Sequence, residues 1–447
     1  MQANKKSAPT PQSPPNFHRF VVVMLCAIGL AGLLSCQSSS KPADPVVRET
    51  PPPSRTPAAP MPDMPVTERP NTAPEISSDN VPDIRVAALK DAAGVKISTG
   101  AAEARVFNAA GAEIERIPAN TSIQMNFSPN ALVANGSPLN ELSLRFESVT
   151  PNTVLKLNDQ DLAPRVTVFR QARGLLAVAQ INLEEYLAGV LAGEVPYDKW
   201  HLEALKAQAI ASRSFAYYQL KKNAAELYDV ESTVMSQVFR AGYRSNPTIA
   251  NIVNSTRGMV LTNNGAAFSA YFHSTCGDHT DPSSLIFPDR PAARPFTPVT
   301  CGFCGQSPSF RWTYSLDKRV LEQKLAANFS ASQHLASVNF LDTNGAAIGS
   351  DATNFRRVAL VQIKRTDGST FQIVANQFRL AVGAKDLKSM LFAQIVDRGS
   401  SIELSGAGFG HGVGLCQWGS EGMAAAGYSH LQILGKYYSG AALTRIY

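Results

Sequence analysis

The most regular pattern of apolar positions in the chain lies between residues 181 and 222. Apolar residues recur there every three or four positions, the spacing that places side chains on one face of a helix; in the first segment they are Leu183, Tyr186, Leu187, Val190 and Leu191. Asn182 can cap this helix, and Gly193 and Pro196 end it. A second helix is predicted from near Asp198 to Lys222. The chain is therefore expected to have a helical centre.

The segments on both sides of this centre alternate apolar and polar residues, which is the period of a half-buried strand. After the centre, two such runs flank Thr366-Asp367-Gly368, a predicted hairpin turn, and a short helix is predicted near Asp386 to Phe392. Before the centre, the runs are IRVAAL, GVKIST, ARVFN, SIQMNF, LSLRF, VTVF and LLAVAQ. The pattern predicts an α+β fold in which β-rich modules flank the helical centre.

The N-terminal residues differ from the rest of the chain. Basic residues precede an apolar run from Phe20 to Leu34, which is short for a bilayer span and has the layout of an export signal. The run ends in Leu33-Leu34-Ser35-Cys36, which resembles a bacterial lipobox, so Cys36 is predicted to be acylated once residues 1–35 are removed. The alternative is an uncleaved membrane anchor. Gln37 after the cysteine resembles an outer-membrane address, facing the periplasm in a host with two membranes.

The next residues, 36–80, are rich in Pro, Ser and Thr and hold almost no large apolar residues. Such a segment cannot bury enough surface to fold, and it is predicted to be a disordered tether that reaches about 140 Å when fully extended. The predicted organisation is a signal peptide (1–35), this tether (36–80), a β-rich module (81–180), a core (181–312) and a second β-rich module with C-terminal helices (313–447).

One acid, Glu194, lies between the two predicted apolar helices. The C-terminal end of a helix disfavours a negative charge, so this carboxyl group is a candidate general acid at neutral pH. Spacing alone favours the other interpretation, a solvated glutamate in a loop. A later acid, Glu203, has a setting typical of a structural ion pair, and Arg379 can pair either with a substrate carboxylate or with an acid of the protein.

Cysteine and histidine form a second candidate site. The chain has six cysteines, of which Cys26 and Cys36 belong to the export signal and lipobox. His273-x-x-Cys276 and Cys301-x-x-Cys304 are two pairs with the spacing of a tetrahedral zinc site, which we expect to be structural because four protein ligands leave no open position. His279 is the substitute ligand. The alternative is a disulfide between Cys301 and Cys304, which an oxidising compartment favours.

Near the C-terminus, glycines are dense from Gly406 to Gly419, which lets backbone approach a ligand or a neighbouring strand closely. His411 within this run is a candidate site residue or a packing residue. The spacing is not that of a dinucleotide or phosphate loop. The formal net charge of +6 is dispersed, which argues against nucleic acid as a partner.

Three blocks resemble the stage II sporulation protein D (SpoIID/LytB) family: EYLAGVLAGEVP with EALKAQAIASRSFA, DVESTVMSQVFRAG, and GHGVGLCQWG. The resemblance implies that Glu194 is the catalytic acid of a peptidoglycan lytic transglycosylase, and that His411, Gln417 and Gln237 lie along the substrate cleft. Some members carry a structural zinc near the HSTCG segment. Cys416 stands where the family usually has serine, and its thiol could compete for the metal.

The resemblance implies two functions. The first is cleavage of the MurNAc–GlcNAc bond of glycan strands by a single glutamate, which gives 1,6-anhydro-MurNAc ends. The second is a non-catalytic, wall-binding enhancer of a cell-wall amidase. A third interpretation is a structural link between the outer membrane and the wall. The expected partners are glycan strands, the membrane through the lipid anchor and an amidase.

Overall fold

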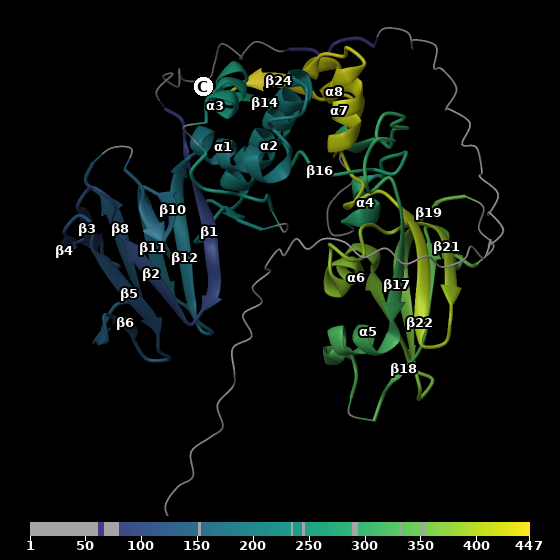
Figure 1. The fold of residues 1–447 in the computed structure, drawn as a ribbon, viewed down its shortest axis with the longest axis horizontal. Coiled ribbons are helices and arrows are strands. Elements are labelled where there is room, and N and C mark those ends of the chain that lie inside the picture. The colour runs from purple at the N-terminus through teal and green to yellow at the C-terminus, as the bar shows by residue number, and fades with distance from the viewer. Residues whose placement is uncertain are drawn as a thin grey trace, which may run out of the picture. The chain divides into compact units, whose positions relative to one another are not determined.

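The computed structural model describes most of the chain beyond the N-terminal region, namely residues 61–66, 80–150, 153–233, 236–243, 246–287, 294–330, 332–350 and 354–447. The predicted signal peptide, Cys36 and almost all of the predicted tether lie outside the described residues. Within the described ranges, no helix has both the length and the apolar character needed to cross a bilayer. Helices and strands are mixed in these ranges (Figure 1).

The described part of the predicted tether, residues 61–66, is packed against the C-terminal end of the chain. Met64 is buried and lies against Gly435, and the Met61 carbonyl accepts a hydrogen bond from Gln432 at 2.9 Å. Val66 forms a β-bridge with Leu443. This piece of the chain is therefore attached to the folded part and is not a free spacer.

Two sheets are built mainly from the region before the helical centre, and their strands are antiparallel except β13, which follows the helical centre in the chain and pairs in parallel with β1. A seven-stranded sheet has the order β13-β1-β12-β11-β8-β3-β4, and a six-stranded sheet has the order β10-β9-β2-β5-β6-β7. Each sequence run predicted as a strand in this region is one. The bounds are β1 Asp83–Ala92, β2 Gly94–Ser98, β3 Ala104–Phe107, β4 Glu113–Ile117, β5 Ser122–Phe127, β6 Leu132–Ala134, β7 Ser137–Leu139, β8 Ser143–Ser148, β9 Leu155–Leu157, β10 Gln160–Ala163, β11 Arg165–Arg170, β12 Leu175–Asn182 and β13 Val230–Glu231.

The predicted helical centre is confirmed. Helix α1 spans Leu183–Glu194, and the Asn182 side chain accepts a hydrogen bond from the backbone N–H of Glu184. Helix α2 spans Leu202–Lys222 and begins later than predicted, because the backbone after Pro196 first makes a tight turn in which the Pro196 carbonyl accepts from Trp200. Helix α3 (Pro247–Ser255) packs with both.

A buried ion pair joins α1 to α2. The Arg213 guanidinium is fully buried and donates to both carboxylate oxygens of Glu184, at 3.0 and 2.8 Å. The hydroxyl of Tyr447 donates to the same carboxylate. Glu203 pairs with Lys206 at 2.7 Å and with His430 at 2.6 Å, which confirms its structural role.

Residues 311–407 form a module with a hydrophobic core of its own, which includes Trp312, Phe340, Phe378 and Phe392. The predicted hairpin around Gly368 is confirmed, since the two flanking strands pair. The elements are β17 Arg311–Asp317, α5 Lys318–Lys324, a 3₁₀ turn at Ala326–Asn328, β18 Leu335–Asp342, β19 Arg356–Arg365, β20 Thr370–Val374, α6 Ala375–Val382, β21 Leu391–Asp397 and β22 Ser401–Ala407.

The short helix predicted near Asp386 to Phe392 is wrong. The helix lies earlier, as α6, and ends at Gly383, whose φ of +123° is a conformation that few other residues adopt. Leu391 instead starts β21, which pairs with β22. Cross-strand pairing and burial decide the structure of this segment more strongly than its local pattern does.

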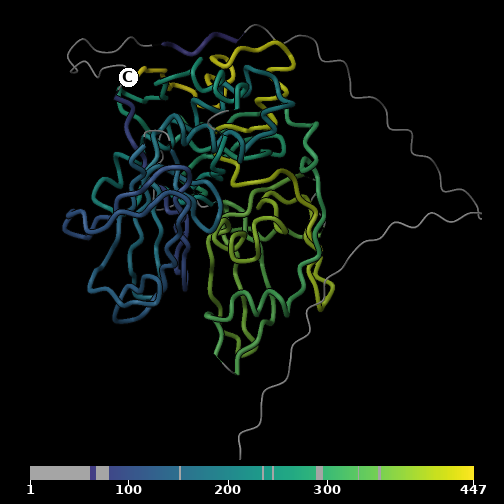
Figure 2. The backbone as a smooth tube through the Cα atoms, turned by 60° about the vertical axis from the view of Figure 1, so that its left-hand side comes forward, coloured from purple at the N-terminus to yellow at the C-terminus, as the bar shows by residue number. Residues whose placement is uncertain are grey.

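After β22 the chain leaves this module and returns to the helical centre. Side chains of its last two helices join the core that contains α2, and the last strand pairs with β14. Figure 2 shows the yellow C-terminal end of the chain beside the teal helical centre. The predicted region 313–447 thus contributes to two cores. The remaining elements lie on both sides of the 311–407 module in the chain. Before it come β14 Met259–Asn263, β15 Ala266–Ala267, β16 Phe272–His273, α4 Ser283–Ile286 and a 3₁₀ turn at Arg294–Phe296. After it come β23 Leu415–Cys416, α7 Gln417–Ala425, α8 His430–Tyr437 and β24 Ala442–Arg445.

Candidate active site and thiol cluster

Glu194 is the last residue of α1, and the chain after β13 holds its side chain in place. A Cβ atom at Gly193 would overlap the Val238 carbonyl, and one at Gly189 would overlap the Arg240 carbonyl. The two glycines therefore let residues 236–240 lie directly on α1. This close approach brings the backbone N–H of Val238 to the Glu194 carboxyl group.

Two hydrogen bonds orient the Glu194 carboxyl group. Oε1 accepts from the Val238 N–H at 2.7 Å, and Oε2 accepts from Nε2 of Gln417, the first residue of α7, at 3.3 Å. Burial raises the pKa of Glu194 above its ordinary value, while these two hydrogen bonds partly oppose the shift. The environment thus favours the protonated acid and also provides donors for the ionised form.

This carboxyl group lines a cavity of about 350 Å³, which we call the acid cavity. Its wall combines aromatic rings with a few polar groups from the core, from residues 409–417 and from α6, including Phe215, Tyr271, His273, Arg379, His411 and Gln417. Among the described residues of this wall, Glu194 is the only carboxylic acid. A mostly apolar cavity with a few convergent polar groups is typical of a ligand site.

Two further cavities continue from the acid cavity. The first, of about 380 Å³, shares Phe215, Tyr271, Arg379 and other wall residues with it, and we call it the α6 cavity. The second, of about 440 Å³, shares Asn223 and Tyr228 with the α6 cavity. The three cavities are therefore neighbours with shared walls, Glu194 lines the first of them, and we call this row of cavities the groove.

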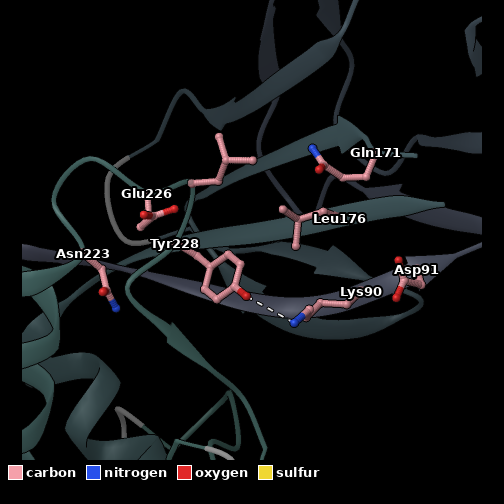
Figure 3. Close-up of a pocket in the computed structure, with 8 residues that line it drawn as sticks. Lys90, Asp91, Gln171, Leu176, Asn223, Glu226 and Tyr228 are labelled. Carbon is pink, nitrogen blue, oxygen red and sulfur yellow. Dashed lines mark hydrogen bonds between the residues drawn. The ribbon is translucent and has the colours of Figure 1, made fainter. Parts of the chain in front are cut away.

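The outer end of the groove lies on the N-terminal β-rich region (Figure 3). Lys90 fixes the Tyr228 ring there, because its Nζ lies 3.2 Å from the Tyr228 hydroxyl and 2.7 Å from Oε1 of Glu231. This outer cavity is larger than the acid cavity, but Glu194 does not line it. We therefore take the acid cavity as the candidate catalytic centre.

The two histidines of the acid cavity are held by the backbone. His411 Nδ1 accepts from the Val413 N–H at 3.0 Å, and His273 Nδ1 lies 3.1 Å from the Val413 carbonyl, to which it donates. Burial lowers the pKa of His411 well below its ordinary value and that of His273 to about 4. Gly410, with φ +113°, lets the two segments approach, since a Cβ there would lie 2.6 Å from the His273 Cβ. Both rings are thus neutral hydrogen-bonding groups.

The structure places the predicted cleft residues unequally. His411 and Gln417 line the acid cavity, as the resemblance implies. Gln237 does not, because it is fully buried and its amide bonds the Tyr186 hydroxyl at 3.0 Å and the Ser212 carbonyl at 3.2 Å. The prediction that Gln237 contacts substrate is therefore corrected: it anchors the segment whose next residue, Val238, binds Glu194. A backbone donor of this kind leaves no signal in side-chain patterns.

Four buried thiols lie together beside this centre. Cys276, Cys301, Cys304 and Cys416 have their sulfur atoms within 4.8 Å of one another, and we call them the thiol cluster. All four are free, so the structure contains no disulfide between Cys301 and Cys304. The prediction of His273 as the fourth ligand is corrected in favour of Cys416, because His273 donates to Val413 and lines the acid cavity instead. The substitute His279 is half-exposed and lies beside Asp281.

The thiol cluster has the chemistry and the size of a zinc site. Four sulfur ligands at about 2.3 Å from a tetrahedral ion lie roughly 3.8 Å apart; the Sγ atoms of Cys276 and Cys304 are 3.5 Å apart. Cys416 Sγ accepts from two backbone N–H groups at 3.3 Å, and the Tyr437 hydroxyl lies 3.1 Å from Cys301 Sγ, where it can donate to a thiolate. Such donors stabilise thiolates around a metal. The cluster could therefore hold a metal ion.

Comparison with known proteins identifies two matched regions in the chain. The Stage II sporulation protein family (SpoIID) matches residues 171–263, which include Glu194 and Val238, and a domain of unknown function (DUF8618) matches residues 299–414. An uncharacterized protein of Brachyspira hyodysenteriae is 34% identical over 268 residues, which are 60% of this chain and 67% of that protein.

Two relatives from Bacillus subtilis are more distant. The Stage II sporulation protein D is 27% identical over 62% of this chain and 78% of its own length, and the amidase enhancer is 28% identical over 58% of this chain and 40% of its own length. The chain belongs to the SpoIID family.

Proposed function

We propose that this protein is a peptidoglycan lytic transglycosylase that cleaves the MurNAc–GlcNAc bond with Glu194 as its single acid and base. The observation that supports this most directly is the position of Glu194, whose carboxyl group has a raised pKa and is the only acid among the described residues of the acid cavity. Ordinary glycosidases need two carboxylates. A lytic transglycosylase needs one, because the sugar supplies the nucleophile.

The proposed reaction has two proton transfers through one carboxyl group. Protonated Glu194 donates to the glycosidic oxygen as the bond from that oxygen to the MurNAc anomeric carbon breaks. The Glu194 carboxylate, held by Val238 and Gln417, then takes the proton of the MurNAc 6-hydroxyl. The oxygen of that hydroxyl forms the new bond to the anomeric carbon. The product is a 1,6-anhydro end, and Glu194 is protonated again.

The acids of the neighbouring α6 cavity are already paired. Asp229 is buried and binds the Arg85 guanidinium at 2.5 Å, and Glu231 binds Lys90 at 2.7 Å. Each of these two carboxylates therefore already has a cation as its partner. This pairing supports a mechanism in which no second carboxylate activates water.

Gln417→Leu should move the alkaline limb of the pH–rate profile to higher pH. Gln417 donates to the ionised carboxylate and so lowers the pKa of Glu194; its loss leaves the effect of burial less opposed, and the acid stays protonated to higher pH. The measurement is glycan turnover against pH. Gln372→Leu, an exposed residue of β20, is the matched control and should leave the limb in place. An unshifted alkaline limb in Gln417→Leu would mean that Gln417 does not affect the protonation of Glu194.

A second candidate function is suggested by the relative named amidase enhancer. In that case the groove binds glycan without cleaving it and the protein stimulates a cell-wall amidase. The two functions differ in a simple assay. Wild type and Glu194→Gln are each added to an amidase, and amidase activity and glycan products are measured. Equal stimulation of the amidase by both proteins, with no glycan product from either, would favour the enhancer.

For the thiol cluster we propose one structural zinc ion held by Cys276, Cys301, Cys304 and Cys416. The ion would join the loop that carries Cys301 and Cys304 to the β16–β23 region beneath the acid cavity. With four protein ligands it would have no open coordination position, so it would act on stability and not on the glycan.

We also propose that the protein is exported and anchored to the cell envelope by a lipid on Cys36. Cys36→Ser should abolish lipid labelling and release the protein from the membrane fraction, because the acylated residue would be gone. Metabolic labelling with a fatty-acid analogue measures this, and Cys26→Ser is the control within the apolar run. Undiminished labelling of Cys36→Ser would rule out this lipid site.

A further inference from the structure

The most unusual charged group in the groove is Arg379 on α6. It is 6% exposed and lines both the acid cavity and the α6 cavity. Its guanidinium donates to two backbone carbonyls, from Nε to Lys388 at 2.9 Å and from Nη2 to Ala384 at 3.3 Å. Among the described residues no carboxylate pairs with it.

The neighbouring Arg357 shows what is missing at Arg379. Arg357 is equally buried, but its guanidinium lies 2.5 Å from Asp281, which is buried with it. Burial and the charge of Arg357 lower the pKa of Arg379 to about 10, so it still carries its proton at neutral pH. A buried charge without a counter-charge is costly, and protein interiors normally pair such groups. The missing counter-charge of Arg379 can come from a ligand in the groove.

Two further groups complete the surroundings of this cation. Lys385, which is exposed, lines the acid cavity and adds a second positive charge. Asn376, one turn before Arg379, lines the α6 cavity, and its Oδ1 is buried without a partner among the described residues. A cation pair beside an unpaired acceptor fits a ligand that presents a carboxylate together with an N–H or O–H group.

We propose that Arg379, assisted by Lys385, is a carboxylate-binding subsite that recognises an acidic group of the muramyl residue in the groove. This inference rests on the proposed function, because it takes the ligand to be a glycan strand. Two sources of carboxylate exist on such a strand. A peptide-free muramic acid carries a free lactyl carboxylate, whereas in a peptide-bearing strand that carboxyl is an amide and the acids are on the peptide.

The subsite assigns a role to a part of the chain outside the SpoIID match. Arg379 and Asn376 lie within residues 299–414, the region matched by the domain of unknown function. Helix α6 lines the acid cavity together with Glu194, which belongs to the SpoIID match. The added module thus selects the substrate, and the core cleaves it.

The test compares ligands on one protein. The full chain with Glu194→Gln, which keeps strands whole, is titrated calorimetrically with a peptide-free glycan tetrasaccharide and with the same sugar whose lactyl carboxyls have been converted to methylamides. The free acid should bind about 10- to 100-fold more tightly, the range expected for a hydrogen-bonded charge pair. Equal affinities would overturn a lactyl subsite without any Arg379 variant having to fold.

A peptide-bearing strand is the second arm and distinguishes the two sources. Arg379→Gln should remove the preference for the free lactyl acid, or, if the peptide supplies the carboxylate, weaken binding of the peptide-bearing strand. Arg379→Lys should keep part of the effect, because it retains the charge without the planar fork. Lys364→Gln removes an exposed charge of β19 that lines neither cavity, and it should change nothing.

Unchanged binding of both strands by folded Arg379→Gln would overturn the proposal. This outcome is separate from failure of the catalytic proposal, because binding is measured and not turnover. Charge-dependent binding without any cleavage product would leave the subsite standing and remove the transglycosylase activity. Normal cleavage with charge-independent binding would do the reverse.

Discussion

Glu194→Gln is expected to abolish glycan cleavage while the protein stays folded and still binds glycan. The amide has nearly the same shape and can still accept from Val238, but it cannot donate a proton to the glycosidic oxygen or take one from the 6-hydroxyl. Removing a general acid typically lowers the rate by about 10² to 10⁴, and a group that serves as both acid and base should reach at least the upper end. Turnover of peptide-free glycan measures this.

Glu115→Gln is the matched control, because Glu115 is an exposed acid of β4 that lines none of the three cavities of the groove. It should keep the wild-type rate. Circular dichroism and glycan affinity should be the same for both variants and the wild type. Full turnover by a folded Glu194→Gln protein would mean that Glu194 is a packing residue and that the catalytic group lies elsewhere.

Cys416→Ser and Cys304→Ser should lose the metal and much of the stability. A closed site of four thiolates couples metal binding to folding, and structural zinc in small domains contributes on the order of 10 kcal/mol. We expect about one zinc per chain in the purified wild type. Both variants should contain substantially less zinc and should unfold at lower temperature, as should the wild type treated with a chelator. Elemental analysis and thermal unfolding are the measurements.

His273→Gln is the informative comparison for the metal. The His273 side chain lies outside the thiol cluster, so this variant should retain the full zinc content. If His273→Gln lost its zinc while Cys416→Ser kept it, the ligands would be His273, Cys276, Cys301 and Cys304, as the sequence predicted. A metal-free wild type whose mass shows a disulfide would eliminate the zinc proposal.

The helical centre could be predicted because its signals are local. Capping by Asn182, the apolar spacing of α1, Gly193 in its last turn and Pro196 after it all act within a few residues. The strands before the helical centre could also be predicted, because period-two alternation and the turn residues between the strands are enough to identify them. Residues 386–392 could not be predicted in this way, because the end of this segment is a strand through its pairing with the distant strands β19 and β22.

Only part of the candidate site could be predicted from the sequence. Glu194 lies in a long motif that resembles the family, but its partners come from distant segments: Val238 contributes a backbone N–H, and Gln417 comes from α7. The number of cysteines could have indicated Cys416 as a metal ligand, because it is the fourth cysteine in the part of the chain that follows the lipobox. Arg379 left two interpretations open, and only its burial without an acidic partner separates them.

The central claim is that a sugar hydroxyl, and not water, attacks the anomeric carbon while Glu194 moves the proton. The most direct measurement is the mass of the glycan fragments released from peptide-free strands by the wild-type protein. The account predicts fragments that end in 1,6-anhydro-MurNAc, lighter by one water than reducing-end fragments, and none from Glu194→Gln. Fragments with reducing ends would contradict it, because they would require a water nucleophile and a second carboxylate.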